Sequence, residues 1–244
     1  SKNDVQASVL TFVPMNDTCE VSQLKLTNNS SEEKTLSVFS YVEWCLWNAD
    51  DDSRNFQRNY STGEVEVVGS TIFHKTEYRE RRNHYAIYSV NAEIAGFDTI
   101  REAFLGSYRG AYEPEAVEKG ACTNSMASGW QPIASHQLNI TLAPGETKSY
   151  VFVLGYIENP EEEKWESYGV INKTRAYAML DRYKTDADVE KAFAELNDYW
   201  KKLLSKYTVK SSNDKVDRMV NIWNQYQCMV TFNTVSYTHL TLPT

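Results

Sequence analysis

Residues 137–156, QLNITLAPGETKSYVFVLGY, read as two β-strands joined by a tight turn. Apolar residues fill two short runs, and the four residues APGE separate them. Pro144 presets one dihedral of that turn, and Gly145 supplies the positive φ that the turn requires. The segment therefore predicts a strand over 137–142, a turn over 143–146 and a second strand over 147–156.

Similar runs occupy the first two-thirds of the chain. Turn-forming clusters such as NNSSEEK (residues 28–34) separate them, and Gly69-Ser70 indicates a hairpin. Many short strands joined by turns predict a mainly β protein built as a large antiparallel β-sandwich. The further predicted strands cover residues 5–11, 21–27, 36–44, 65–68, 71–78 and 84–90.

The strand predicted over 36–44 carries large side chains on both faces. Phe39 and Tyr41 lie on one face, so we expect both faces of this strand to be covered. The opposite face carries Leu36, Val38, Ser40, Val42 and Trp44. By contrast, residues 95–130 are Gly-rich and irregular, and we expect a long loop or a lid there.

The pattern changes after residue 160. Residues 160–184 are charged and resemble a linker. Two helical stripes with a 3.6-residue period follow, the first capped by Thr185 or Asp186 and the second within 211–214. The first stripe is Val189, Phe193, Leu196, Trp200, Leu203 and Leu204. The second is Val216, Met219, Val220, Trp223, Tyr226 and Val230.

The net charge of −8 and the pI of about 5.1 argue against a nucleic-acid partner. The sequence shows no signal peptide and no apolar run long enough to span a bilayer. The four Cys residues are widely spaced, which favours small buried thiols in a reducing, cytoplasmic setting. The four His residues lack metal-ligand spacing, so we expect no metal.

The candidate site is residues 41–58, YVEWCLWNADDDSRNFQR. Aromatic faces beside amide and guanidinium groups suit a sugar, which shows apolar C–H faces and many hydroxyls. The candidate substrate-binding residues are Trp47, Asn48, Asn55, Gln57 and Arg58. The simpler interpretation, solvated loop residues with the acidic run 50–52 at the surface, stays open.

Three other features have structural interpretations. The charged segment 75–84, KTEYRERRNH, is typical of an exposed, cross-paired strand face. Trp130 in the sequence GWQP indicates a structural corner, with sugar stacking the minor alternative. Glu113, Glu115 and Glu118 have no spacing that indicates an acid/base pair, so we assign no catalytic residue.

Several blocks resemble the cellobiose phosphorylases, glycoside hydrolase family 94 (formerly glycosyltransferase family 36). They are YVEWCLWNADDDSRNFQRNYSTGEVEV, HKTEYRERRNHYA, GFDTIREAFLGSYRG, GWQPIASHQLNITLAPGE and RMVNIWNQYQCMVTFN. The resemblance implies a galactose-mutarotase-like supersandwich (1–183), a helical linker (184–206) and the first helix of an (α/α)6 catalytic barrel (207–233). Residues 234–244, TVSYTHLTLPT, look non-native, and we expect them to pack poorly.

The resemblance also implies an activity for a longer parent protein, an inverting glycosyltransferase that converts cellobiose and phosphate into α-glucose 1-phosphate and glucose. It implies no metal or organic cofactor, a homodimer, and a sandwich loop carrying Asn48, Asn55, Gln57 and Arg58 at the acceptor sugar. The catalytic acid and phosphate site would lie beyond this chain, so we expect the 244 residues alone to be inactive. Alternatives are a cellodextrin, laminaribiose or chitobiose phosphorylase, a carbohydrate-binding or assembly module, or a dimerisation domain.

Overall fold

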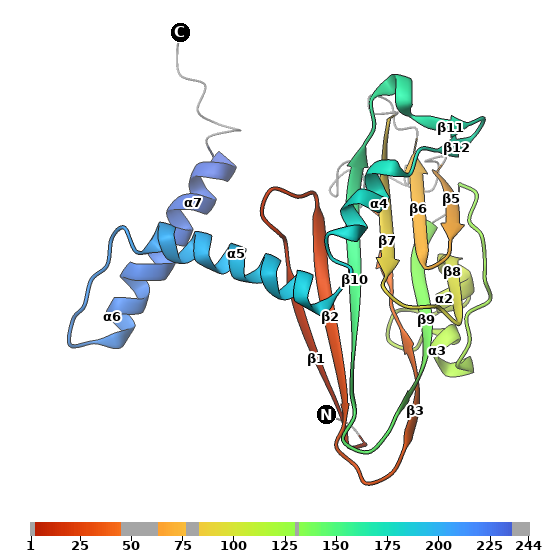
Figure 1. Cartoon of the computed structure of the whole chain (residues 1–244), viewed down its shortest axis with the longest axis horizontal. Helices are drawn as coiled ribbons and strands as arrows, with labels where there is room; N and C mark the ends of the chain where they lie inside the picture. The colour runs from red at the N-terminus through yellow and green to blue at the C-terminus, as the bar shows by residue number, and fades with distance from the viewer. Residues whose placement is uncertain (1–2, 45–62, 77–82, 130–131, 236–244) are drawn as a thin grey trace. The chain divides into compact units, whose positions relative to one another are not determined.

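The computed structural model describes residues 3–44, 63–76, 83–129 and 132–235. The chain forms two compact units, residues 1–190 and 191–244, which are treated separately below. The first unit is an antiparallel β-sandwich with a few short helices (Figure 1). The second unit is helical.

Two main sheets make the sandwich. The larger sheet has six strands in the order β1-β2-β10-β7-β6-β5, and the smaller sheet has the order β3-β9-β4 with β8 also paired to β9. All of these pairings are antiparallel. The strands are β1 (Val5–Phe12), β2 (Cys19–Asn28), β3 (Lys34–Phe39), β4 (Val42–Glu43), β5 (Gly63–Val68), β6 (Thr71–Thr76), β7 (His84–Val90), β8 (Gly96–Ile100), β9 (Pro132–Leu142) and β10 (Thr147–Glu158).

The turn predicted over 143–146 is confirmed, and Gly145 has the positive φ of 74°. The turn does not close a hairpin, because β9 lies in the smaller sheet and β10 in the larger one. The fully buried Asn28 holds this crossing, since its side-chain amide donates to the carbonyl oxygens of Leu142 and Ala143. The turn thus connects the two layers of the sandwich.

The strand predicted over 36–44 is interrupted at residues 40–41, which separate β3 from β4. The prediction that both of its faces are covered is confirmed. Leu36, Val38, Val42 and Trp44 pack against the core between the sheets. Phe39 and Tyr41 pack against a second cluster formed by Phe104, Leu105, Ala116 and Ile133.

The prediction of an irregular loop over 95–130 is wrong in part, because short regular elements form there, and the alternative prediction of a packed lid agrees with this second cluster. The region contains β8, helix α2 (Arg101–Leu105) and helix α3 (Glu115–Lys119). The fully buried Asp98 organises it, because its carboxylate accepts hydrogen bonds from the backbone and hydroxyl groups of Thr123 and Ser125. The segment is therefore a cover for the outer face of the smaller sheet.

The linker predicted over 160–184 is also wrong. It contains a 3₁₀ turn (η2, Glu161–Glu163), a two-stranded hairpin of β11 (Trp165–Ser167) and β12 (Val170–Ile171), and helix α4 (Thr174–Asp181). Ala176 and Met179 of α4 are buried. A Cβ added to Gly155 of β10 would lie 2.7 Å from the Met179 sulfur, so helix and sheet are in close contact.

The predicted helix after residue 185 is confirmed as α5 (Asp186–Leu204). Thr185 caps it, since its hydroxyl accepts from the Asp188 amide while the Asp188 carboxylate accepts from Thr185. Asp186 has a different role, because its carboxylate accepts from Gln23 and Ser149 on the larger sheet. This pairing fixes the start of α5 on the sandwich.

The second predicted helix forms as three consecutive pieces. These are α6 (Asp214–Arg218), a π-helical turn (η3, Met219–Trp223) and α7 (Asn224–Val235). Asn213 caps α6 by accepting from the Lys215 amide. Helix α7 continues to Val235, two residues into the predicted non-native tail, and residues 236–244 lie outside the described residues. Within the described residues, the structure has no helix with both the length and the apolarity to cross a membrane.

The cysteines differ in exposure. The prediction of a buried thiol is confirmed for Cys19, Cys122 is half-buried, and Cys228 is exposed, so the prediction is wrong there. Burial and the nearby Asp17 carboxylate raise the pKa of Cys19 to about 12, which makes it a poor nucleophile. Cys45 lies outside the described residues.

Candidate functional site

The five predicted sugar-binding residues, Trp47, Asn48, Asn55, Gln57 and Arg58, all lie outside the described residues. The same is true of the acidic run 50–52 and of Trp130. The structure does describe the chain on both sides of residues 45–62. Trp44 follows β4 on one side, and Glu64 lies near the start of β5 on the other.

Trp44 is anchored on the larger sheet. Its indole ring centre lies 5.4 Å from that of His74, with an angle of 30° between the ring planes. His74 belongs to β6 and is buried, and burial lowers its pKa to about 4, so the imidazole is neutral near pH 7. A neutral imidazole beside an indole makes a mostly apolar support for this end of β4.

Glu64 is anchored by charge. The Lys75 ammonium lies 2.7 Å from the Glu64 carboxylate and 3.3 Å from that of Glu66, and it also donates to the carbonyl oxygen of Gly169. These three acceptors surround the ammonium. Lys75 is buried, and the prediction of an exposed face over 75–84 is wrong for this residue.

Glu66 joins a second buried lysine to the same cluster. Its other carboxylate oxygen lies 2.6 Å from the Lys173 ammonium, and its first oxygen accepts from the Ile171 amide. Burial alone would raise the pKa of Glu66, but the hydrogen bonds from Lys173 and Ile171 outweigh it and the pKa is lowered. We call Glu64, Glu66, Lys75 and Lys173 the charge cluster; it ties the β11–β12 hairpin to β5 and β6.

The pairing of Glu64 with Lys75 in this cluster could be predicted from the sequence. A hairpin centred on Gly69-Ser70 places Glu64 directly opposite Lys75, and that is the observed register. An opposite-charge pair is what such a register favours. Lys173 had no such signal, because its approach depends on the unpredicted β11–β12 hairpin.

The hairpin carries an exposed aromatic residue above the cluster. Trp165 is 39% exposed. The Lys75 ammonium lies 5.1 Å from the centre of its ring and the Lys164 ammonium 4.4 Å from it. Cations at these distances are attracted by the aromatic quadrupole.

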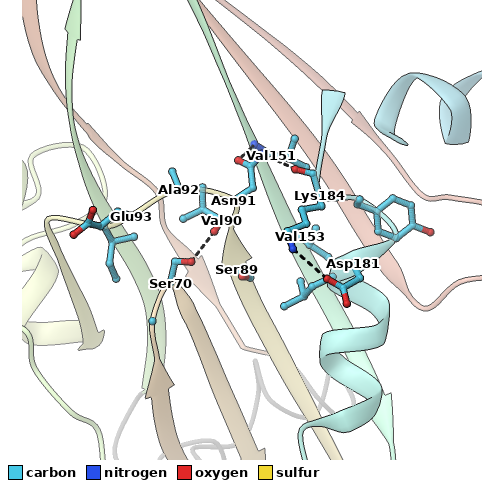
Figure 2. Close-up of a pocket in the computed structure, with 14 residues that line it drawn as sticks. Ser70, Ser89, Val90, Asn91, Ala92, Glu93, Val151, Val153, Asp181 and Lys184 are labelled. Atoms are coloured by element: carbon cyan, nitrogen blue, oxygen red, sulfur yellow. Dashed lines mark hydrogen bonds and ion pairs between the residues drawn. The ribbon is translucent and has the colours of Figure 1, made fainter. Parts of the chain in front are cut away.

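A separate hollow lies on the outer face of the larger sheet (Figure 2). Its volume is about 610 Å³, and Val90, Val151 and Val153 form much of its lining. Asn91 fixes one side, because its side chain donates to the Lys184 carbonyl and accepts from the Val151 amide. The size suits a small molecule. Ser70 and Asn91 in its lining already bind backbone groups, and its charged residues are Glu93 and the ion pair of Lys184 with Asp181.

A smaller opening of about 290 Å³ lies between the two sheets. Tyr88 and Phe152 line it, and Ser40 at its wall contacts the buried His136, with 3.2 Å between Oγ and Nδ1. Burial lowers the pKa of His136 to about 4. These groups support the core and do not form an acid/base pair.

Two acidic residues of α3 form ion pairs. Glu115 pairs with Lys119 and Glu118 with Arg109, all at the surface. Among the described residues, His, Cys, Asp and Glu form no group of three or more that could hold a metal ion.

The architecture, a large antiparallel sandwich followed by helices, is that of a supersandwich domain joined to a helical one. The family description "Glycosyl hydrolase 94, supersandwich domain" matches residues 1–186, and "Glycosyl hydrolase 94 superfamily, catalytic domain" matches residues 199–239. The chain belongs to glycoside hydrolase family 94.

Curated relatives cover nearly all of this chain. The N,N'-diacetylchitobiose phosphorylase of Vibrio proteolyticus is 29% identical over 92% of the chain and 26% of that protein. The solabiose phosphorylase of Paenibacillus borealis is 25% identical over 93% of the chain and 28% of that protein. The cyclic beta-(1,2)-glucan synthase NdvB of Rhizobium meliloti is 26% identical over 85% of the chain and 7% of that protein. The chain thus spans about a quarter of the two phosphorylases.

Proposed function

We propose that this chain is the N-terminal part of an inverting disaccharide phosphorylase. The observation that carries the proposal is the order of the two family matches, a supersandwich over 1–186 followed by the start of a catalytic domain over 199–239. Two relatives that are named phosphorylases also support it, because each aligns with both regions of this chain in a single alignment.

The reaction places clear demands on the complete protein. An oxygen of hydrogen phosphate attacks the anomeric carbon, the glycosidic C–O bond breaks, and a carboxylic acid protonates the leaving oxygen. The phosphate gives up its proton to restore that acid, so sugar 1-phosphate and free sugar are the only products. Phosphate is already a nucleophile and needs a cationic cradle rather than a base.

Cellobiose is the proposed substrate on the resemblance of the sequence blocks, and N,N'-diacetylchitobiose is the alternative favoured by the name of the Vibrio proteolyticus relative. Asn48, Asn55, Gln57, Arg58 and Trp47 are the proposed contacts to the acceptor sugar. A homodimer is proposed for the complete protein. The charge cluster anchors the start of β5, directly after residues 45–62.

The test is phosphorolysis by a protein in which residues 1–235 continue into a complete catalytic domain. It is incubated with phosphate and, in turn, cellobiose, N,N'-diacetylchitobiose, laminaribiose and solabiose. We expect phosphate-dependent release of a sugar 1-phosphate from one of them. Sugar release that proceeds equally well without phosphate, or no turnover of any disaccharide, would refute the proposal.

The 244-residue chain provides the matched comparison. We expect it to release no sugar 1-phosphate above a blank, because the matched part of the catalytic domain is limited to residues 199–239. Turnover by this chain alone would show that the acid and the phosphate cradle are both within it.

A further inference from the structure

The observation behind this inference is the opening of about 290 Å³ between the two sheets. It lies beside residues 40–41, where the smaller sheet changes from β3 to β4. At this point Ser40 bonds to β9 partly through its side chain, since its hydroxyl accepts from the His136 amide at 3.0 Å. The interruption of the strand therefore places a polar side chain at the wall of a mainly apolar hollow.

Tyr88 forms a restrained part of the lining. The residue is only 8% exposed, and it reaches the opening from β7. Its ring centre lies 5.0 Å from that of His136 and 6.0 Å from that of Phe152, with angles of 26° and 22° between the ring planes. Burial raises the pKa of Tyr88 to about 12, and the nearby Glu20 carboxylate adds to the increase, so the hydroxyl is neutral near pH 7.

The polar groups of the lining offer mainly hydrogen-bond acceptors. The Ser22 hydroxyl bonds to that of Thr11 at 2.8 Å, which leaves it at least one acceptor lone pair. The Tyr88 hydroxyl bonds to Ser40 and likewise keeps acceptor capacity. The Glu20 carboxylate is exposed, and within the described part of the chain it makes no hydrogen bond or ion pair. A ligand that donates several hydrogen bonds therefore fits this lining.

The same lining disfavours other ligands. Glu20 is the one charged side chain among the described lining residues, so phosphate and other anions are repelled. A purely apolar ligand would strip water from the hydroxyls without replacing its hydrogen bonds. The volume is near the lower end of the range for small-molecule pockets, about 300–1,000 Å³, and suits a single ring.

The remaining wall is aliphatic and partly open to solvent. Val9 is 62% exposed, although it is a large apolar residue on the inner face of β1. A ring with C–H groups would remove such surface from water, which is favourable. The aliphatic residues of the wall are Val9, Leu24, Val38, Val42 and Leu154.

We propose that this opening binds one neutral pyranose, whose hydroxyls donate to Glu20, Ser22 and Tyr88 while its C–H groups pack on the aliphatic wall. The choice of a sugar among neutral hydroxylated rings rests on the proposed function. Because stacking restrains Tyr88 before binding, the ligand orders little of the protein. None of the described lining residues belongs to the five proposed contacts to the acceptor sugar, so this is a second carbohydrate site.

Saturation-transfer NMR on the 244-residue chain measures the binding. The probes are glucose and N-acetylglucosamine, the monosaccharide halves of cellobiose and N,N'-diacetylchitobiose. Mannitol, which has hydroxyls but no ring, is the control solute, and α-glucose 1-phosphate tests the effect of charge. We expect saturable transfer at millimolar concentration to at least one monosaccharide, none that saturates with mannitol, and at least tenfold weaker binding of the phosphate ester.

Variants locate the bound sugar. Ser22→Leu extends a larger side chain into the opening and should abolish saturable binding, whereas Ser8→Leu makes the same change on β1 outside the lining and should bind normally. Tyr88→Phe removes only a hydroxyl and should weaken binding at least fivefold. Tyr150→Phe is its matched control, because Tyr150 is a partly buried tyrosine of β10 outside the lining, and it should stay within about twofold of the parent.

Thermal unfolding of each variant separates loss of binding from loss of fold. Three results would overturn the inference: no saturable transfer to either monosaccharide, undiminished binding by a folded Ser22→Leu variant, or α-glucose 1-phosphate binding as tightly as glucose. A complete protein that phosphorolyses a disaccharide while the parent chain binds no monosaccharide would remove this site and leave the proposed function intact. Binding that Ser22→Leu abolishes, together with an inactive complete protein, would do the reverse.

Discussion

The Lys173 ammonium nitrogen lies 2.6 Å from a carboxylate oxygen of Glu66, and their side chains are only 6% and 19% exposed. Removing one partner of such a pair costs about 3–5 kcal/mol when the other charge is left buried without compensation. After Lys173→Met the Lys75 ammonium still lies 3.3 Å from Glu66, so we expect this variant to lower the free energy of unfolding by less than that full amount. Urea denaturation of the sandwich, followed by circular dichroism, measures the loss.

Two further variants separate charge burial from side-chain loss. Lys119→Met removes an exposed ion pair with Glu115 and should cost no more than about 0.5 kcal/mol. Replacing Glu66, Lys75 and Lys173 together by methionines should recover much of the loss, because the only charge left without its partner is Glu64, whose side chain is 65% exposed. A single variant as stable as the parent would show that the pair contributes nothing.

Gly155 in β10 should tolerate no side chain. A Cβ there would lie 2.7 Å from the Met179 sulfur and 2.9 Å from a methylene carbon of Ile87. Both neighbours are buried, so we expect Gly155→Ala to destabilise the sandwich by about 1–3 kcal/mol. Gly110→Ala is the control, since nothing lies within 4 Å of the added carbon. Equal thermal midpoints for the two variants would contradict close helix–sheet packing at this point.

Two buried histidines predict acid sensitivity. Burial lowers the pKa of His74 and of His136 from 6.5 to about 4, so the unfolded chain binds more protons between these values. Stability is therefore fully present above pH 6.5 and falls as the pH drops towards 4, by roughly 3 kcal/mol for each imidazole. The lowered pKa of Glu66 adds a loss of the same sign at still lower pH.

Urea denaturation at pH 7, 6 and 5 measures this dependence. His74→Phe keeps an aromatic ring against Trp44 and removes one titrating group. We expect this variant to lose stability less steeply between pH 6.5 and 4 than the parent. A parent whose stability is constant across that range would show that these imidazoles have the same pKa in the folded and the unfolded state.

The helical unit should cause the chain to associate. A groove of about 850 Å³ within it is lined by Trp200, Leu203, Leu204, Ile222, Trp223 and Tyr226. Trp223 is 56% and Ile222 48% exposed, and apolar patches of this kind promote association. We expect oligomers that grow with concentration in light scattering, and Ile222→Lys with Trp223→Lys should reduce them. A strictly monomeric parent chain would contradict this prediction.

The sandwich could be predicted because its strands are short apolar runs between clear turn signals. The structure of residues 160–184 was not predicted because charged and polar side chains dominate that segment. Ala176 and Met179, which pack α4 against β10, are only two residues among many. The prediction for residues 95–130 was wrong in part for a related reason. Their order depends on Asp98, whose contacts with Thr123 and Ser125 link positions 25 or more residues apart.

The candidate site was predictable only in part. The register of the β5–β6 hairpin was enough to predict the pairing of Glu64 with Lys75. The burial of Lys75 could not be predicted, because it depends on contacts with Gly169 and Trp165 in a hairpin far along the chain. The role of Trp47 and its neighbours stays a prediction.

The turn at residues 143–146 also has a kinetic consequence. It passes the chain from β9 in one layer to β10 in the other, and β10 then pairs with β2, where Thr147 meets Thr27. Such pairings close long loops before they gain contacts, and high contact order slows folding to milliseconds or seconds. Neither layer can be completed from a contiguous stretch of chain, so the sandwich should form in one cooperative, late step and not sheet by sheet.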